Sequence, residues 1–116
     1  MKRDFDLIRK ILLYVEENHD EGSLMIKKLE DYNNQTLIFH CKILEEKGFL
    51  KGTALESLTS GNDDFQCFGI TYDGYEFLDK IRNKTFWEKI KKYAKHHAME
   101  IGFNTINTIF TIIGSI

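Results

Sequence analysis

The chain has 116 residues, 42% hydrophobic and 29% charged, a globular composition that excludes an intrinsically disordered chain. Its 16 Lys and Arg residues and 18 Asp and Glu residues give a formal net charge of −2, which excludes a generally basic nucleic-acid binder but not a local basic face. Proline is absent, so nothing forces a helix to break.

The first predicted element is an amphipathic helix from Asp4 to Asn18. Phe5, Ile8, Leu12 and Val15 recur at helical spacing, and charged residues lie off this stripe. A polar break follows. The next stretch, SLMIKKLE, is compatible with either a strand or a single helical turn.

A helix predicted over residues 34–47 has clear signals at both ends. Asn33 or Asn34 is suited to cap its N-terminus, because an Asn side-chain oxygen accepts hydrogen bonds from first-turn amides. Gly48 follows where a left-handed terminating residue is required. The residues predicted to face the core are Leu37, Cys41 and Leu44. The positions predicted to face outward are therefore Gln35, Ile38, Phe39, Lys42 and Glu46.

A hairpin and a third helix are predicted next. The candidate strands cover about 49–58 and 65–70, joined by a polar turn at Ser60–Asp64. Thr71 then caps a helix over residues 72–82, whose inward positions are Phe77, Leu78 and Ile81.

The rest of the chain is predicted to form a helical extension over residues 84–116. Thr85 and Glu88 have the spacing of a capping box, and the helix after them buries Phe86 or Trp87, then Ile90 and Ala94. Helical geometry places the apolar residues of the tail on one half, while its many Ile and Thr residues keep a strand as the alternative.

The order of these elements (helix, short segment, helix, hairpin, helix) is that of a winged helix-turn-helix domain, in which the helix before the hairpin reads DNA. We therefore expect an α+β fold with a winged-helix domain over residues 1–83 and a helical C-terminal extension over 84–116.

Two motifs also resemble a family of small bacterial and phage proteins, domain of unknown function 2513, over residues 1 to about 90. The first runs from Met1 through Asp4 and Asp6 to Leu12, and the second from Ile70 to Arg82; His40 and Trp87 fit the same pattern. The resemblance implies a winged-helix fold, occurrence in Gram-positive bacteria and their phages, and no established activity. It supplies no catalytic residue. The sequence departs from the family pattern at Tyr75, more often His, and in its tail, which is usually charged.

Candidate DNA contacts on the helix before the hairpin are Gln35 and Lys42 to bases and Thr36 to phosphate. Residues 1–70 hold nine basic and 13 acidic residues, and Asp63 and Asp64 stand where many wings carry Arg or Lys. The only basic stretch is 80–97, where Lys84, Lys91 and Lys92 are candidate phosphate contacts. We expect DNA binding that is at best weak and salt-sensitive.

The apolar face of the tail is expected to be buried against another surface. It either folds back on its own domain, pairs with a second copy to form a homodimer, or inserts into a membrane interface. The candidate interface residues are Ile106, Ile109, Phe110, Ile113 and Ile116. The tail is too short for a transmembrane helix.

We find no catalytic, metal or cofactor motif and expect a non-enzyme. Cys41 and Cys67 are expected to be buried and reduced in a cytoplasmic protein, and His40 to be a structural residue. Two functions stay open: a DNA-binding regulator and a protein-interaction module, for an unknown partner. Charge around the 34–47 helix discriminates between them, because a positive face favours DNA and an apolar or acidic face favours a protein.

Overall fold

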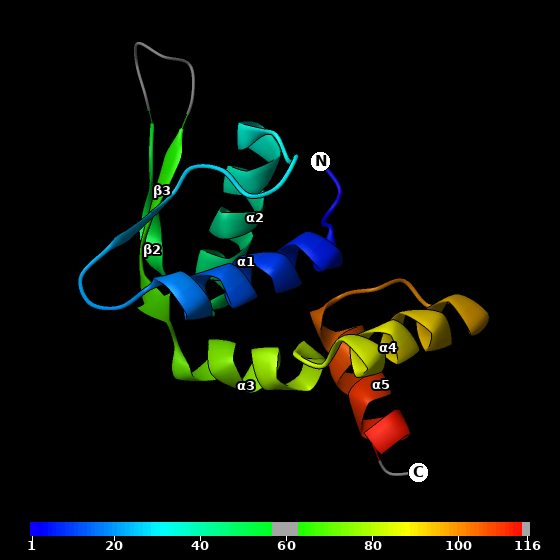
Figure 1. The fold of residues 1–116 in the computed structure, drawn as a ribbon. Coiled ribbons are helices and arrows are strands. Elements are labelled where there is room, and N and C mark those ends of the chain that lie inside the picture. The colour runs from blue at the N-terminus through cyan, green and yellow to red at the C-terminus, as the bar shows by residue number, and fades with distance from the viewer. Residues whose placement is uncertain (57–62, 115–116) are drawn as a thin grey trace. The chain divides into compact units, whose positions relative to one another are not determined.

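A computed structural model describes residues 1–56 and 63–114, and over these residues the expected α+β fold is confirmed (Figure 1). The described elements are α1 (Phe5–Asn18), β1 (Leu24–Ile26), α2 (Asn34–Lys47), β2 (Leu50–Leu55), β3 (Asp64–Ile70), α3 (Tyr72–Ile81), α4 (Lys84–His96) and α5 (Phe103–Gly114). The chain divides into two compact units between Phe77 and Leu78, inside α3.

The predicted first helix is confirmed as α1. Asp4 caps it, because its Oδ1 accepts hydrogen bonds from the amides of Asp6 and Leu7 at 3.0 and 3.2 Å. The buried face of α1 is wider than the predicted stripe and consists of Phe5, Leu7, Ile8, Ile11, Leu12 and Val15. This face contacts α2 and β3 and supplies much of the core of the first unit.

The sheet is antiparallel in the order β1-β3-β2, so the short segment after the first helix is a strand and not a helical turn. Cys67 in β3 lies opposite Leu24 in β1 and Gly52 in β2. Cys67 and Phe65 are buried, whereas Phe68, at the bulge of β3, is exposed. The predicted turn at Ser60–Asp64 lies outside the described residues except for Asp63 and Asp64.

Both ends of α2 are as the sequence predicts. Asn33 caps the helix by accepting from the Thr36 amide at 2.8 Å, and Gly48 ends it in the left-handed region at φ 85°. The predicted core residues Leu37, Cys41 and Leu44 are fully buried. The outward prediction for Ile38 is wrong: only 3% of it is exposed, because α1 and the sheet both pack on α2 and widen its buried face.

The junction between Gly48 and Gly74 joins α2, the hairpin and α3. The Thr71 hydroxyl donates to the Gly48 carbonyl and accepts from the Gly74 amide at 3.0 Å, which caps α3 as predicted. The Thr71 amide donates to the Phe49 carbonyl at 3.0 Å. The Phe49 and Phe77 rings stack at 5.0 Å. The end of α2, the hairpin and the start of α3 are therefore joined to one another by these contacts.

The second unit contains α4 and α5, which pack on each other. The capping box at Thr85 and Glu88 is wrong: α4 begins one residue earlier and Asn83 caps it, accepting from the Phe86 amide at 2.9 Å. Trp87, Ile90 and Ala94 are buried, as predicted. The strand alternative for the tail is wrong over Phe103–Gly114, because these residues form a helix that places its large apolar side chains on one side.

Gly74→Ala tests the close approach of α3 at the junction. A Cβ on Gly74 would collide with the Phe49 carbonyl oxygen and lie 2.7 Å from the Ile70 side chain. We expect Gly74→Ala to lower the free energy of unfolding by about 2 kcal/mol, measured by urea denaturation. Asp73→Ala, in the same turn but exposed, is expected to cost less than about 1 kcal/mol. Equal costs would contradict the close approach.

Candidate interaction surfaces

The outward face of α2 carries the three candidate DNA contacts predicted there. Gln35 and Lys42 are exposed and Thr36 is half-buried. Phe39, half-buried, lies between Gln35 and Lys42 by helical spacing. The exposed charges of α2 are Lys42 and Lys47 against Glu45 and Glu46, so the face carries no net positive charge.

The base of the hairpin is fixed beside the N-terminus of α2. The Asn34 amide nitrogen donates to the Asp63 carbonyl at 2.6 Å, and the Asn34 oxygen accepts from the Asp63 amide at 2.9 Å. This bidentate contact brings Asp63 and Asp64 close to the end of α2 that carries Gln35 and Thr36. Carboxylates at this position oppose phosphate binding rather than support it.

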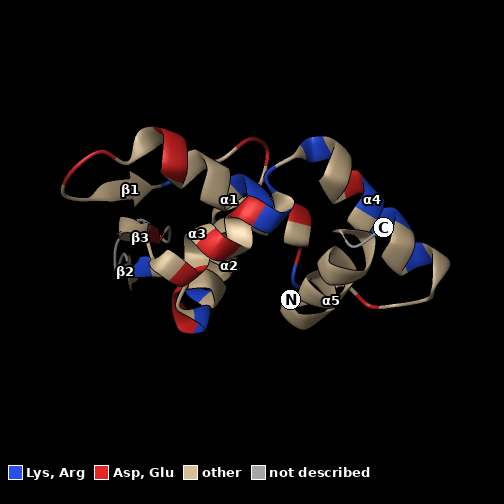
Figure 2. Cartoon of the chain, turned by 90° about the horizontal axis from the view of Figure 1, so that it is seen from below, with Lys and Arg blue, Asp and Glu red and all other residues tan. Residues whose placement is uncertain are grey.

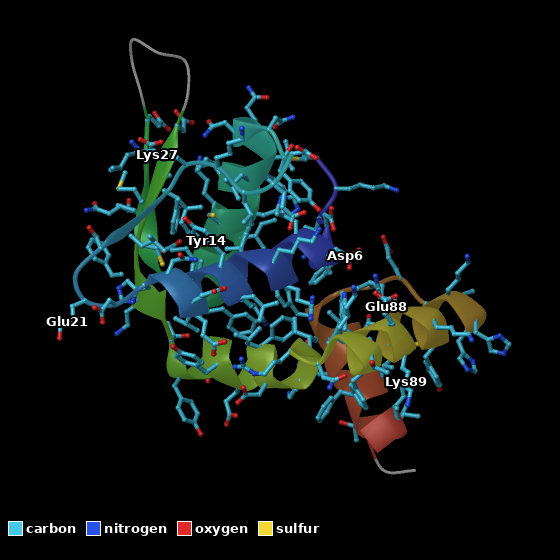
Figure 3. The ribbon with its side chains drawn as sticks, in the orientation of Figure 1. Asp6, Tyr14, Glu21, Lys27, Glu88 and Lys89 are labelled. Atoms are coloured by element: carbon cyan, nitrogen blue, oxygen red, sulfur yellow. The ribbon has the colours of Figure 1, made fainter. Side chains whose placement is uncertain are left out.

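The second predicted basic surface is a face of α4 opposite Trp87, Ile90 and Ala94. Lys84, Lys89, Lys92 and Lys95 are all exposed there, and Figure 2 shows basic residues along most of α4. Glu88 is the one acidic residue of the helix, and in Figure 3 it lies on the opposite side of α4 from Lys89.

Lys91 belongs less clearly to this basic face. Its ammonium lies 3.1 Å from the Glu88 carboxylate and 5.6 Å from the centre of the Trp87 ring. Of the three lysines predicted from the sequence, Lys84 and Lys92 are exposed and Lys91 is half-buried. The exposed basic face of α4 therefore consists of Lys84, Lys89, Lys92 and Lys95.

The predicted interface residues of the tail divide into two groups. Ile106 and Ile109 are fully buried within the chain, and Phe110 and Ile113 are half-buried. Ile116 lies outside the described residues. The Phe110 ring packs edge-on against Phe86 at 5.4 Å, so much of the apolar face of α5 is covered by α4. Among residues 1–56 and 63–114, no helix is long and apolar enough to cross a membrane.

His40 is a buried structural residue, as expected. The Asp4 amide donates to Nε2 at 2.8 Å, and Nδ1 lies 2.7 Å from the Thr36 carbonyl oxygen. Because Nε2 accepts, the proton is assigned to Nδ1, which donates to Thr36. The imidazole, with both nitrogens hydrogen-bonded, thus ties the start of α1 to α2.

Cys41 and Cys67 are both buried free thiols. Burial, with a smaller contribution from the neighbouring Cys67, raises the pKa of the Cys41 thiol to about 12. At neutral pH such a thiol is not a nucleophile. In the part of the chain that the structure describes, no group of three His, Cys, Asp or Glu residues could hold a metal ion.

Sequence reasoning missed a set of exposed aromatic side chains in the first unit. Tyr72 and Tyr75, at the start of α3, are 78% and 42% exposed, and Phe68 at the end of β3 is 49% exposed. A signal was present: the spacing that turns Phe77 and Leu78 inward also turns both tyrosines outward.

Comparison with known proteins supports the resemblance found in the sequence. The family model described as "Hypothetical protein (DUF2513)" matches residues 2–100. A protein of Haemophilus influenzae named "Uncharacterized protein" is 32% identical over 110 residues, covering 94% of this chain and 92% of its own. Relatives therefore extend beyond the Gram-positive bacteria and phages that the resemblance implies. No solved structure matches the chain significantly.

His40→Ala tests the link between α1 and α2. The substitution removes the acceptor of the buried Asp4 amide and opens a cavity, so we expect the free energy of unfolding to fall by about 2–4 kcal/mol. His96→Ala is the matched control because His96 is exposed, and it should change stability by less than about 0.5 kcal/mol. Similar urea midpoints for the two variants would show that His40 is not a structural link.

Substitution of two isoleucines in α5 tests whether this helix belongs to the core of the chain or forms a dimer interface. Ile109→Ala should cost about 2–4 kcal/mol because Ile109 is fully buried. Ile112→Ala, at a position that is 37% exposed, should cost less than about 1 kcal/mol. Urea denaturation and light scattering check both. Conversion of a dimer to a monomer by Ile109→Ala, without loss of monomer stability, would instead make α5 an interface.

Proposed function

The chain belongs to the DUF2513 family, and we propose that it is a non-enzymatic protein-interaction module built on a winged-helix scaffold. The order α1, β1, α2, β2, β3, α3 and the antiparallel sheet β1-β3-β2 support the scaffold. One feature departs from the helix-turn-helix pattern: described residues 27–33, between β1 and α2, contain no helix.

The observation that carries the proposal is the composition of the face that would have to read DNA. Lys42 and Lys47 on α2 are balanced by Glu45 and Glu46, and the hairpin base adds Asp63 and Asp64. Affinity for DNA depends largely on neutralising phosphates, and this face offers little net positive charge to do so. Half-exposed Phe39 is instead typical of a surface that contacts protein.

A second candidate, a regulator of transcription that binds DNA, is favoured by one observation. The exposed lysines of α4 form a basic face that can contact phosphates without reading bases. Such contacts give binding that is independent of sequence and falls steeply with salt. We therefore propose at most a weak nucleic-acid affinity through Lys84, Lys89, Lys92 and Lys95.

Fluorescence anisotropy with a pool of randomised DNA duplexes tests the proposal, at low and at physiological ionic strength. We expect the wild type to bind DNA only at low salt. The triple variant Lys84→Glu/Lys89→Glu/Lys92→Glu should lose this binding, because α4 then repels phosphate. The double variant Gln35→Ala/Lys42→Ala should bind like the wild type. The matched charge control is Lys27→Glu/Lys28→Glu, two exposed lysines after β1.

The opposite pattern would overturn the proposed function. Selection of a sequence-specific duplex that stays bound at physiological salt, with loss of binding in Gln35→Ala/Lys42→Ala, would make α2 a recognition helix. The chain would then be a DNA-binding regulator.

A further inference from the structure

The exposed aromatic side chains of α3 have a fixed orientation. Gly74 faces the Phe49 carbonyl and Phe77 stacks on the Phe49 ring, so the opposite side of the first turns must face outward. Tyr72 and Tyr75 lie on that side, three residues apart, and are 78% and 42% exposed. Neither ring is needed to bury the core.

Two exposed carboxylates, Asp73 and Glu76, lie close in sequence to the two tyrosines. Glu76, one turn from Tyr72, accepts a hydrogen bond from the Tyr72 hydroxyl, and this bond together with the charges of Glu76 and Asp73 raises the pKa of Tyr72. Helical spacing of four residues places the exposed Glu76 carboxylate on the same face of α3 as the Tyr72 ring. Within the described part of the chain, neither Asp73 nor Glu76 forms an ion pair with a basic residue.

We propose that Tyr72, Tyr75 and Glu76 form a docking surface for an arginine side chain in a basic segment of a partner protein. This inference rests on the proposed function and names the surface and the chemistry of the partner. A guanidinium group can lie flat on a tyrosine ring while its N–H groups donate to a carboxylate held beside that ring. Charge complementarity selects this occupant, because the exposed carboxylates of Asp73 and Glu76 make the surface negative.

Other occupants fit the surface less well. A nucleic acid would bring phosphates against Asp73 and Glu76. A purely apolar segment would bury both carboxylates without a partner, which costs free energy. A lysine ammonium can pair with Glu76, but it lacks the planar guanidinium group that can stack on a ring and hydrogen-bond a carboxylate at the same time. The observations therefore favour arginine over lysine.

The test uses the full chain and two fluorescein-labelled synthetic peptides, one of alternating Arg and Gly and one of alternating Lys and Gly, followed by anisotropy. We expect the arginine peptide to bind several-fold more tightly than the lysine peptide. Tyr72→Ala/Tyr75→Ala, which leaves the charge unchanged, should weaken arginine-peptide binding about fivefold to tenfold.

Further variants separate the ring from the carboxylate. Glu76→Gln should weaken binding about fivefold by removing the charge, and Tyr72→Phe should have a smaller effect because it keeps the ring. Matched controls are Glu46→Gln, an exposed carboxylate on α2, and Tyr14→Ala, a half-buried ring on α1 (Figure 3). Both should bind like the wild type. Unfolding midpoints confirm that each variant is folded.

Three results would overturn the docking surface. They are equal affinity for the two peptides, unchanged binding in Tyr72→Ala/Tyr75→Ala, or equal losses in the two controls. Concentration-dependent self-association in analytical ultracentrifugation, removed by Glu76→Lys, would assign the surface to a second copy and also overturn it. These results leave the DNA measurement on α2 unaffected, so failure of this inference is distinguishable from failure of the proposed function.

Discussion

The close approach of α3 to Phe49 at Gly74 is the constraint on which the first unit depends. Only a residue without a side chain allows the helix to lie against the Phe49 carbonyl. Thr71 makes use of that proximity, since its hydroxyl donates to the carbonyl of Gly48, which ends α2, and accepts from the Gly74 amide in the first turn of α3. The sheet, α2 and α3 are thereby fixed to one another at a single point.

This constraint also explains what the motifs of the family do. In the first motif Asp4 caps α1 and its amide is bound by His40; in the second, Thr71 and Gly74 build the junction. Most of the residues that carry the resemblance therefore have a structural reason. Tyr72 and Glu76 do not, because they lie on the face that the junction turns to solvent, and Tyr75, where the sequence departs from the family pattern, lies on the same face.

The mild net charge of −2 conceals a separation of charge along the chain. The first unit is acidic at the hairpin base and on α3, while the basic residues concentrate on α4. Positive charge is thus placed on a helix other than the one that precedes the hairpin. This distribution of charge supports the proposal that the first unit contacts basic protein segments rather than reads bases.

Local signals in the sequence were sufficient to predict most of the helices and strands. The caps at Asn33 and Thr71 and the terminator at Gly48 were predictable because each satisfies backbone groups a few residues away. The burial of Ile38 was not predictable in the same way, since α1 and the sheet, distant in sequence, decide it.

The same distinction applies to the second unit and to the candidate site. The sequence predicted a capping box at Thr85, but Asn83 caps α4 instead, because its oxygen accepts from the Phe86 amide of a helix that starts at Lys84. The lysines of α4 could be predicted as a basic surface from the distribution of charge in the sequence alone. The α3 surface had a local signal in the spacing of Phe77 and Leu78, whereas the close approach at Gly74 depends on contacts with Phe49, which is distant in sequence.

The most direct measurement is a pair of NMR titrations of the isotope-labelled full chain, one with the arginine peptide and one with duplex DNA at physiological salt. The account predicts that the peptide shifts the resonances of Tyr72, Tyr75 and Glu76. It predicts that DNA leaves Gln35, Thr36 and Lys42 unchanged. Shifts of those three α2 residues with DNA, and none on α3 with the peptide, would contradict it.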